Sequence, residues 1–354
     1  MKTIPGHDSI RKAYPLPTFF LPLLISSVLV FSSCTNHATD PTEQNTLSTA
    51  VQLTRDGDAN EIGWLDDGTD IVYVASTLHG SILEGVVKSV NLTTNVIRTL
   101  DDSLRIFNAF RTAGDSILYV TLNPDNSTGV YLISGINPQP VISLISDRAY
   151  NAMISPDHKL VAATSSGSLF LASTTSSSRS VLSLQSSEEL AAFSPDSKQI
   201  LLSSGRILDI TNGSFSALPF SIPSAPVWLD WNSTGIWALT FTQDTTQTYY
   251  LTDLNSNNKR AIWSAPKAQL PGFVFAWSPD NNKIAVLRST QMNVTPTVHY
   301  LYVCDISKKS ATQIAVDTVN IHQYVLPGIS SVAFSPDGSR IAYSANGNIF
   351  YQNL

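Results

Sequence analysis

The sequence is poor in charge, and this shortage restricts its function. Charged residues make up 14% of the 354-residue chain, which favours a β-rich extracytoplasmic protein with a neutral polar surface. The first 33 residues carry three of the 21 basic residues and one of the 27 acidic residues, so the remainder has a net charge near −8. It has no block of Lys or Arg, and nucleic-acid binding needs clustered cations that neutralise phosphates. We therefore expect no nucleic-acid partner.

The sequence also lacks the motifs of common catalytic and cofactor sites. It has no Gly-x-Ser-x-Gly elbow and no Gly-rich phosphate loop, which argues against an α/β-hydrolase domain and a nucleotide site. The six histidines have no metal-ligand spacing; they are His7, His37, His79, His158, His299 and His322. Paired acids stand at 66–67, 101–102 and 188–189, but sequence spacing does not show whether they share a cleft. We predict no catalytic residue, no metal and no cofactor.

The N-terminus has the pattern of an export signal. Lys2, Arg11 and Lys12 precede an apolar run of 13 residues at 19–31. A membrane-spanning helix needs about 20 apolar residues, so a shorter run behind a basic flank indicates a secretory signal. Only two cysteines are present, Cys34 directly after this signal and Cys304 in an apolar run, so no disulfide framework is expected.

The end of the signal, Phe31-Ser32-Ser33-Cys34, resembles the lipobox of bacterial lipoproteins. In that family small residues precede a cysteine that is acylated and becomes the new N-terminus, and Phe31 departs from the usual Leu. The resemblance implies a signal peptide over 1–33 and a lipid on Cys34. The alternative is an uncleaved N-terminal anchor, which would also hold the protein at a membrane.

A polar stretch follows the cysteine at 34–48 and is predicted to be a flexible tether, because it is too polar to join a core. Thr35, rather than Asp, follows Cys34. Under the enteric sorting rule, which the lipoprotein resemblance brings in, this favours the outer membrane, on its periplasmic side.

Residues 49–354 contain an internal repeat centred on a Ser-Pro-Asp turn between two apolar runs. Clear copies begin at Ser155, Ser194, Ser278 and Ser335, and degenerate copies lie at 64–68, 110–114 and 231–235. The fourth residues of the seven turns are 46, 44, 39, 38, 46 and 57 residues apart, close to the 40 to 45 residues of a four-stranded propeller blade. An insertion at 291–297 or 319–327 explains the last, longest gap.

The copies agree beyond the turn. Six carry an aromatic residue three positions before the aligned one: Trp64, Phe110, Phe193, Trp231, Trp277 and Phe334. Five carry Gly or Ala one position earlier: Gly63, Ala109, Ala192, Ala276 and Ala333. Neighbouring residues of a strand point to opposite faces, so we expect the small residues to lie near a crowded central channel and the aromatic ones between blades.

Each turn is followed by two more apolar strands and, in six units, by a polar fourth strand suited to an outer edge. The seventh unit ends before a fourth strand, whereas 51–55 looks like a fourth strand with no unit before it. The sequence therefore predicts an all-β, seven-bladed β-propeller of four-stranded antiparallel blades, closed by pairing of 51–55 with 348–354.

The copy at 332–343, Val-Ala-Phe-Ser-Pro-Asp-Gly-Ser-Arg-Ile-Ala-Tyr, resembles the WD-like propeller repeats of the TolB tail. The resemblance covers about 51–354 and implies the propeller fold, while the N-terminal α/β domain of TolB has no counterpart here. We transfer no partner from that family, because the fold hosts many functions.

Two functions remain open from the sequence. The first is a monomeric, non-enzymatic scaffold, anchored through Cys34, that binds an envelope protein or another ligand through loops on a rigid ring. The alternative is an envelope hydrolase or lyase that uses acids around the central channel to act on a glycan or peptide. The residues that line the channel would discriminate between them.

Overall fold

The computed structural model describes residues 50–354 except 80–81, 105–106, 123–127, 135–150, 166, 177, 186–187, 223–227, 243–245, 267–269, 291–296 and 320–327. All of them belong to one compact unit, Thr46–Leu354. The predicted signal and tether, with Cys34, lie outside the described residues. Among the residues described, no helix is long and apolar enough to cross a membrane.

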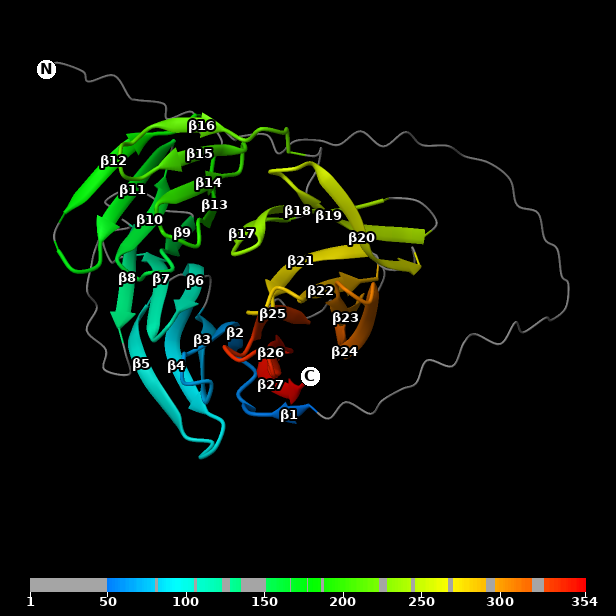
Figure 1. Cartoon of the computed structure of the whole chain (residues 1–354). Helices are drawn as coiled ribbons and strands as arrows, with labels where there is room; N and C mark the ends of the chain where they lie inside the picture. The colour runs from blue at the N-terminus through cyan, green and yellow to red at the C-terminus, as the bar shows by residue number, and fades with distance from the viewer. Residues whose placement is uncertain are drawn as a thin grey trace, which may run out of the picture. The chain divides into compact units, whose positions relative to one another are not determined.

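The described chain is a β-propeller whose sheets follow one another along the sequence (Figure 1). We number the repeat units 1 to 7 in chain order. Unit 1 contains β2 (Ala59–Trp64), β3 (Asp70–His79), β4 (Ile82–Asn91) and β5 (Ile97–Leu104). Unit 2 contains β6 (Phe107–Ala113), β7 (Ser116–Leu122) and β8 (Thr128–Ser134). Unit 3 contains β9 (Asn151–Ile154), β10 (Leu160–Ser165), β11 (Ser168–Ser173) and β12 (Arg179–Ser183).

The remaining units repeat this order. Unit 4 contains β13 (Leu190–Phe193), β14 (Gln199–Leu202), β15 (Arg206–Asp209) and β16 (Phe215–Ala217). Unit 5 contains β17 (Trp228–Asn232), β18 (Gly235–Phe241), β19 (Thr246–Asp253) and β20 (Asn258–Pro266). Unit 6 contains β21 (Leu270–Trp277), β22 (Lys283–Ser289), β23 (Thr297–Asp305) and β24 (Ser310–Val319). Unit 7 contains β25 (Ile329–Phe334), β26 (Arg340–Ala345) and β27 (Asn348–Asn353), to which β1 (Val51–Gln52) adds.

The prediction of four-stranded antiparallel blades is confirmed, but the number of complete blades needs correction. Six sheets have four strands, and the sheet of unit 2 has three, in the order β6-β7-β8. The structure therefore shows six four-stranded blades rather than seven. The reason is that β8 has no outer partner among the described residues, since the chain that follows it, 135–150, lies outside them.

The predicted closure by the N-terminal strand is confirmed. β1 pairs antiparallel with β27, with Val51 opposite Tyr351 and Gln52 opposite Phe350. The backbone N–H of Leu53 donates to the carbonyl of Ile349 over 2.8 Å. The segment that leads into unit 1 thus supplies the fourth strand of unit 7, so the two ends of the propeller chain are joined in one sheet.

The core lies between neighbouring sheets rather than in one central mass. Where their side chains are described, the second strands of the units are largely buried, as their apolar runs predict; these strands are β3, β7, β10, β14, β18, β22 and β26. The outermost strands, such as β12 at the rim in Figure 1, expose residues such as Val181. The first strand of each unit lies nearest the centre, where successive units contact one another.

Candidate functional site: the central cavity

A cavity of about 750 Å³ lies where the first strands of the units converge. Its lining comes from β2, β6, β9, β13, β17, β21 and β25, so every unit contributes at least one residue. The volume falls in the range of ordinary ligand sites, which is about 300 to 1,000 Å³. The lining residues are Glu61, Ile62, Gly63, Thr112, Met153, Ile154, Pro156, Ala191, Ala192, Phe193, Trp228, Asp230, Val274, Phe275, Ala276, Trp277, Ser330, Val332 and Ala333.

The small residues of the repeat line this cavity, as the sequence predicts. Gly63, Ala192, Ala276 and Ala333 are all in the lining, whereas the side chain of Ala109 lies outside the described ones. A Cβ added to Gly63 would lie 2.4 Å from the side chain of Thr112 in the next unit. The position is therefore small because neighbouring first strands approach closely there.

The aromatic residues of the repeat do not all stay between the sheets. Trp64 is buried and its indole N–H donates to the carbonyl of Ala333 over 3.0 Å. Phe193 and Trp277, by contrast, also reach the cavity. The predicted separation of small and aromatic faces therefore holds for the small residues and only partly for the aromatic ones.

Units 5 and 6 form an aromatic wall on one side of the cavity, which we define as Trp228, Phe275 and Trp277. The ring of Trp228 stacks on Phe275, with centroids 5.7 Å apart and planes 12° apart. It also lies 5.7 Å from Trp277 in a tilted arrangement. All three side chains are only partly buried and all three line the cavity, so the wall belongs both to the packed seam between the units and to the cavity lining.

Two carboxylates are in the lining, Glu61 on β2 and Asp230 on β17. Asp230 stands two residues after Trp228 in a strand whose pairing with β18 is regular, so both side chains point to the same face. Its Oδ1 accepts a hydrogen bond from the backbone N–H of Trp231 over 2.8 Å. The carboxylate of Asp230 therefore lies on the same side of the strand as the ring of Trp228.

The position of Asp230 in the repeat is unusual. It occupies the position that is Gly or Ala in five units, directly before the aromatic residue. A charged residue at a position selected for small size marks a departure from the structural pattern. Glu61 and Trp228 carried no comparable signal, because they lie outside the aligned turn.

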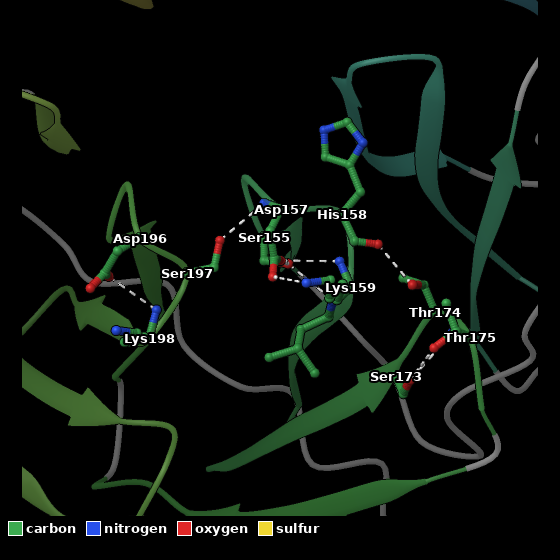
Figure 2. Close-up of polar contacts among 11 residues, drawn as sticks. Ser155, Asp157, His158, Lys159, Ser173, Thr174, Thr175, Asp196, Ser197 and Lys198 are labelled. Atoms are coloured by element: carbon green, nitrogen blue, oxygen red, sulfur yellow. Dashed lines mark hydrogen bonds and ion pairs between the residues drawn. The ribbon is translucent and has the colours of Figure 1, made fainter.

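The Ser-Pro-Asp turns join the first and second strands of the units. In unit 3 the hydroxyl of Ser155 donates to the carboxylate of Asp157 over 2.7 Å (Figure 2). The backbone N–H of Lys159 donates to the same carboxylate, and the backbone N–H of Leu160 donates to the Ser155 hydroxyl. His158 has a φ of +61°, in the left-handed region that such a turn requires at this position. The same bonds recur at Ser194, Ser278 and Ser335, so the motif encodes a rigid turn.

Neighbouring turns also touch. The backbone N–H of Asp157 donates to the hydroxyl of Ser197 in unit 4 over 3.0 Å, as Figure 2 shows. The side-chain amide of Asn281 in unit 6 donates to Ser233 in unit 5 over 2.9 Å. Pro156 of the unit 3 turn lines the cavity. The turns therefore connect neighbouring units and contribute to the cavity wall.

The turn aspartates are held ionised by their own turns. Hydrogen bonds from the Ser194 hydroxyl and the Lys198 backbone lower the pKa of Asp196. The corresponding bonds from Ser278 and Asn282 lower the pKa of Asp280, and those from Ser335 and Ser339 lower the pKa of Asp337. Carboxylates stabilised in this way serve the turn, and none of these three lines the cavity.

The other acids considered from the sequence do not converge on the cavity. Glu188 accepts hydrogen bonds from Arg206 over 2.9 Å and from Ser204. Asp101 accepts one from the hydroxyl of Tyr119. Asp67 accepts from the backbone of Thr69 over 2.8 Å. Each is explained by local structure, so the paired acids of the sequence do not form one site.

Among the described residues, no group of three or more His, Cys, Asp and Glu side chains could hold a metal ion. His299 and Asp317 do approach each other as cross-strand neighbours on β23 and β24. The Nδ1 of His299 accepts a hydrogen bond from the backbone N–H of Ile329 over 3.2 Å. Burial lowers the pKa of His299 and raises that of Asp317.

Cys304 is fully buried, and burial raises the pKa of its thiol to about 12. This agrees with its interpretation as a small apolar core residue. It packs with Leu251, Ile284 and Val286 between units 5 and 6.

No family model matches the chain. No curated protein matches it either. Among solved structures, the chain is similar to the β-propeller domain of Cps50 (Swd1) from Myceliophteria thermophila, with a TM-score of 0.56 and 15% identity over 85% of this chain and 98% of that one. In all, 919 solved chains match, which agrees with a fold that serves many functions. The similarity establishes the β-propeller fold and leaves the function to the site.

Proposed function

We propose that this protein is a binding scaffold whose ligand or protein partner enters the central cavity. The observation that carries the proposal is the cavity itself, which has about 750 Å³ and an aromatic wall on one side. Partly buried aromatic side chains in a concave site offer apolar contact with little loss of side-chain freedom. The surrounding blades hold these rings in place, so the site is formed before any ligand binds.

Cavity filling tests this proposal. Ala276→Phe would place a ring in the cavity, because Ala276 is a partly buried lining residue. Val181→Ser is the matched control on the rim, where Val181 is 54% exposed. We expect wild-type protein and the control to capture a partner from detergent-solubilised membrane fractions, and the filled variant to lose it while keeping its thermal unfolding transition. Capture by the filled variant at wild-type level would contradict the cavity as the site.

The proposal includes the cellular address inferred from the N-terminus. A lipid on Cys34 would hold the propeller at the bacterial envelope, with the periplasmic side of the outer membrane favoured, and the TolB-like repeat supports an envelope setting. Labelling with radioactive palmitate should mark the wild-type chain and not Cys34→Ser. A chain that is exported, keeps residues 1–33 and takes no label would instead be held by an uncleaved anchor.

The alternative, an envelope enzyme that acts on a glycan or peptide, draws on Glu61 and Asp230 in the cavity lining. Hydrolysis by two carboxylates requires a defined separation between them, and most of the side chains in the lining are apolar. The double variant Glu61→Gln/Asp230→Asn separates the two functions. Turnover of an envelope glycan or peptide by the wild type, abolished in the double variant, would favour the enzyme.

A further inference from the structure

We propose that the central cavity binds a positively charged side chain, Arg or Lys, presented by a partner polypeptide. This inference rests on the proposed function, since it names the chemistry of the ligand that the cavity would take. The positive group would lie against the aromatic wall, within reach of the field of Asp230 and Glu61.

The aromatic wall supplies the first argument. An ammonium or guanidinium group is attracted to the face of a Trp, Tyr or Phe ring when it lies within about 6 Å of the ring centre. Trp228 has one face stacked on Phe275, is only partly buried and is one of the residues that line the cavity.

The chain uses this interaction elsewhere in the same fold. Three of the six tryptophans have an arginine guanidinium over the ring. The distances from the guanidinium carbon to the ring centre are 5.5 Å for Arg340 and Trp64, 4.8 Å for Arg260 and Trp237, and 5.3 Å for Arg288 and Trp263. Within the described part of the chain, no Lys or Arg lies in such a position over Trp228, Phe275 or Trp277. The rings of the aromatic wall thus lack a cation from the described part of the chain, whereas Trp64, Trp237 and Trp263 each have one.

Charge supplies the second argument. The described lining contains two carboxylates, Glu61 and Asp230, and no Lys, Arg or His. Carboxylates beside an apolar wall act in a medium of lower dielectric than water, which strengthens their attraction for a cation. The acidic chain, with a net charge of −6, adds long-range attraction for a basic partner.

The remaining lining distinguishes a peptide from a sugar or a small cation. A sugar needs several neutral hydrogen-bonding groups around its ring, and the side chains of the described lining offer only the hydroxyls of Thr112 and Ser330 beside the two acids. The volume of about 750 Å³ is much larger than one ammonium or guanidinium group. It leaves room for residues on both sides of a basic side chain.

The test uses the full chain in detergent and three capped pentapeptides, Ala-Ala-Xaa-Ala-Ala, in which Xaa is Arg, its neutral isostere citrulline, or Glu. Binding is measured by calorimetry and by tryptophan fluorescence. We expect the Arg peptide to bind about tenfold more tightly than the citrulline peptide, since one cation–ring contact with a nearby acid is worth about this much. The Glu peptide should not bind.

Two variants locate the interaction. Asp230→Asn keeps an oxygen that can accept from Trp231 but removes the charge, and Trp228→Leu removes the ring. Each should reduce the preference for Arg over citrulline at least threefold, which corresponds to part of one such contact. Asp102→Asn, at an exposed position on β5, is the matched control and should leave the preference unchanged. Thermal unfolding of every variant checks that the fold is intact.

Several outcomes would overturn the inference. Equal binding of the Arg and citrulline peptides, or an unchanged preference in Asp230→Asn, would show that the cavity does not recognise the positive charge of the peptide. Methylguanidinium that binds as tightly as the Arg peptide would indicate a small-cation site, and tighter binding of a neutral oligosaccharide would indicate a sugar site. If Ala276→Phe abolishes partner capture while the peptides bind without regard to charge, the proposed function stands and this inference fails. If Ala276→Phe leaves capture unchanged, both fail.

Discussion

Two seams between neighbouring units use different chemistry. The closure seam, where unit 7 meets unit 1, is rich in hydrogen bonds that involve the backbone. The N–H of Ile62 donates to the Ser331 hydroxyl over 3.1 Å, and the N–H of Ile349 donates to the Thr54 hydroxyl over 2.9 Å. The N–H of Ala59 donates to the carbonyl of Gly347 over 2.7 Å. The aromatic seam, between units 5 and 6, packs Trp228, Phe275 and Trp277 around one side of the cavity.

The aromatic seam also buries a charge. Arg288 is 0% exposed, donates to the side chain of Gln247 over 2.8 Å, and lies near the rings of Tyr249 and Trp263. Directional hydrogen bonds specify one register, as the closure of a ring requires. Ring packing tolerates neighbours of varied chemistry and leaves ring surface available. The difference indicates that the closure seam serves the fold, whereas the aromatic seam serves both the fold and the cavity.

Deletion of residues 49–56 should have the largest effect, because it removes β1 and the Thr54 side chain from the closure seam. The exposed edge of β27 and the lost buried bonds should lower the free energy of unfolding by about 4 kcal/mol or more, which corresponds to roughly 10 °C in Tm. Calorimetry measures the change. A double variant Val51→Thr/Gln52→Thr keeps the strand and should unfold near the wild-type temperature. An unchanged Tm in the deletion would refute closure by this strand.

Gly347→Ala should have the next largest effect. The residue has a φ of +70°, and an added Cβ would lie 2.1 Å from the backbone oxygen of Gly57, so two backbone segments of the closure seam must separate. We expect a loss of about 3 kcal/mol. Gly213→Ala is the matched control, with a φ of +71° and no atom within 4 Å of the added Cβ, and should cost only about 1 kcal/mol. Equal losses in urea titration would show that the close approach is unimportant.

The pair Trp64→Phe and Trp277→Phe compares the two seams directly. Both changes remove the same volume, but only Trp64 donates its indole N–H to a carbonyl, that of Ala333. The indole nitrogen of Trp277 is buried and has no hydrogen-bond partner in the described part of the chain. Trp64→Phe should therefore cost about 1 kcal/mol more than Trp277→Phe. A larger loss for Trp277→Phe would contradict the contrast between the seams.

The pH dependence at the seam between units 6 and 7 should be the smallest effect. Burial lowers the pKa of His299 below its ordinary value of 6.5, so the unfolded chain binds more protons there and stability falls as the pH drops below about 6.5. Asp317, with a pKa raised by burial above 3.8, acts in the opposite sense at lower pH. Urea stability measured at pH 7 and 5.5 should fall less on acidification in His299→Asn than in the wild type. An equal fall would exclude His299 as the cause.

The repeat made most of the fold predictable. Ser155, Ser194, Ser278 and Ser335 each begin a turn with the same hydrogen bonds, because Pro, Asp and a residue that tolerates positive φ determine the backbone locally. The apolar run after each turn became a buried strand, and 51–52 became the closing strand. The number of complete four-stranded blades was predicted wrongly, since unit 2 has three strands in the described residues.

The cavity was only partly predictable. The repeat located its small residues, Gly63, Ala192, Ala276 and Ala333, because strand alternation assigns neighbouring residues to opposite faces. It did not bring Asp230 together with Glu61, which are 169 positions apart in the sequence. Nor did it show that Trp228 and Trp277 share a wall, since that contact depends on the angle at which two units pack.

The sequence by itself determined the local elements of this protein: the turns, the order of the strands and the segment that closes the ring. These follow from backbone preferences and from alternation of side chains, which act over a few residues. Only the tertiary structure decided which side chains from different units meet in the cavity, and which aromatic rings keep a face there. Such meetings depend on how the sheets pack around the centre, and no single repeat contains that information.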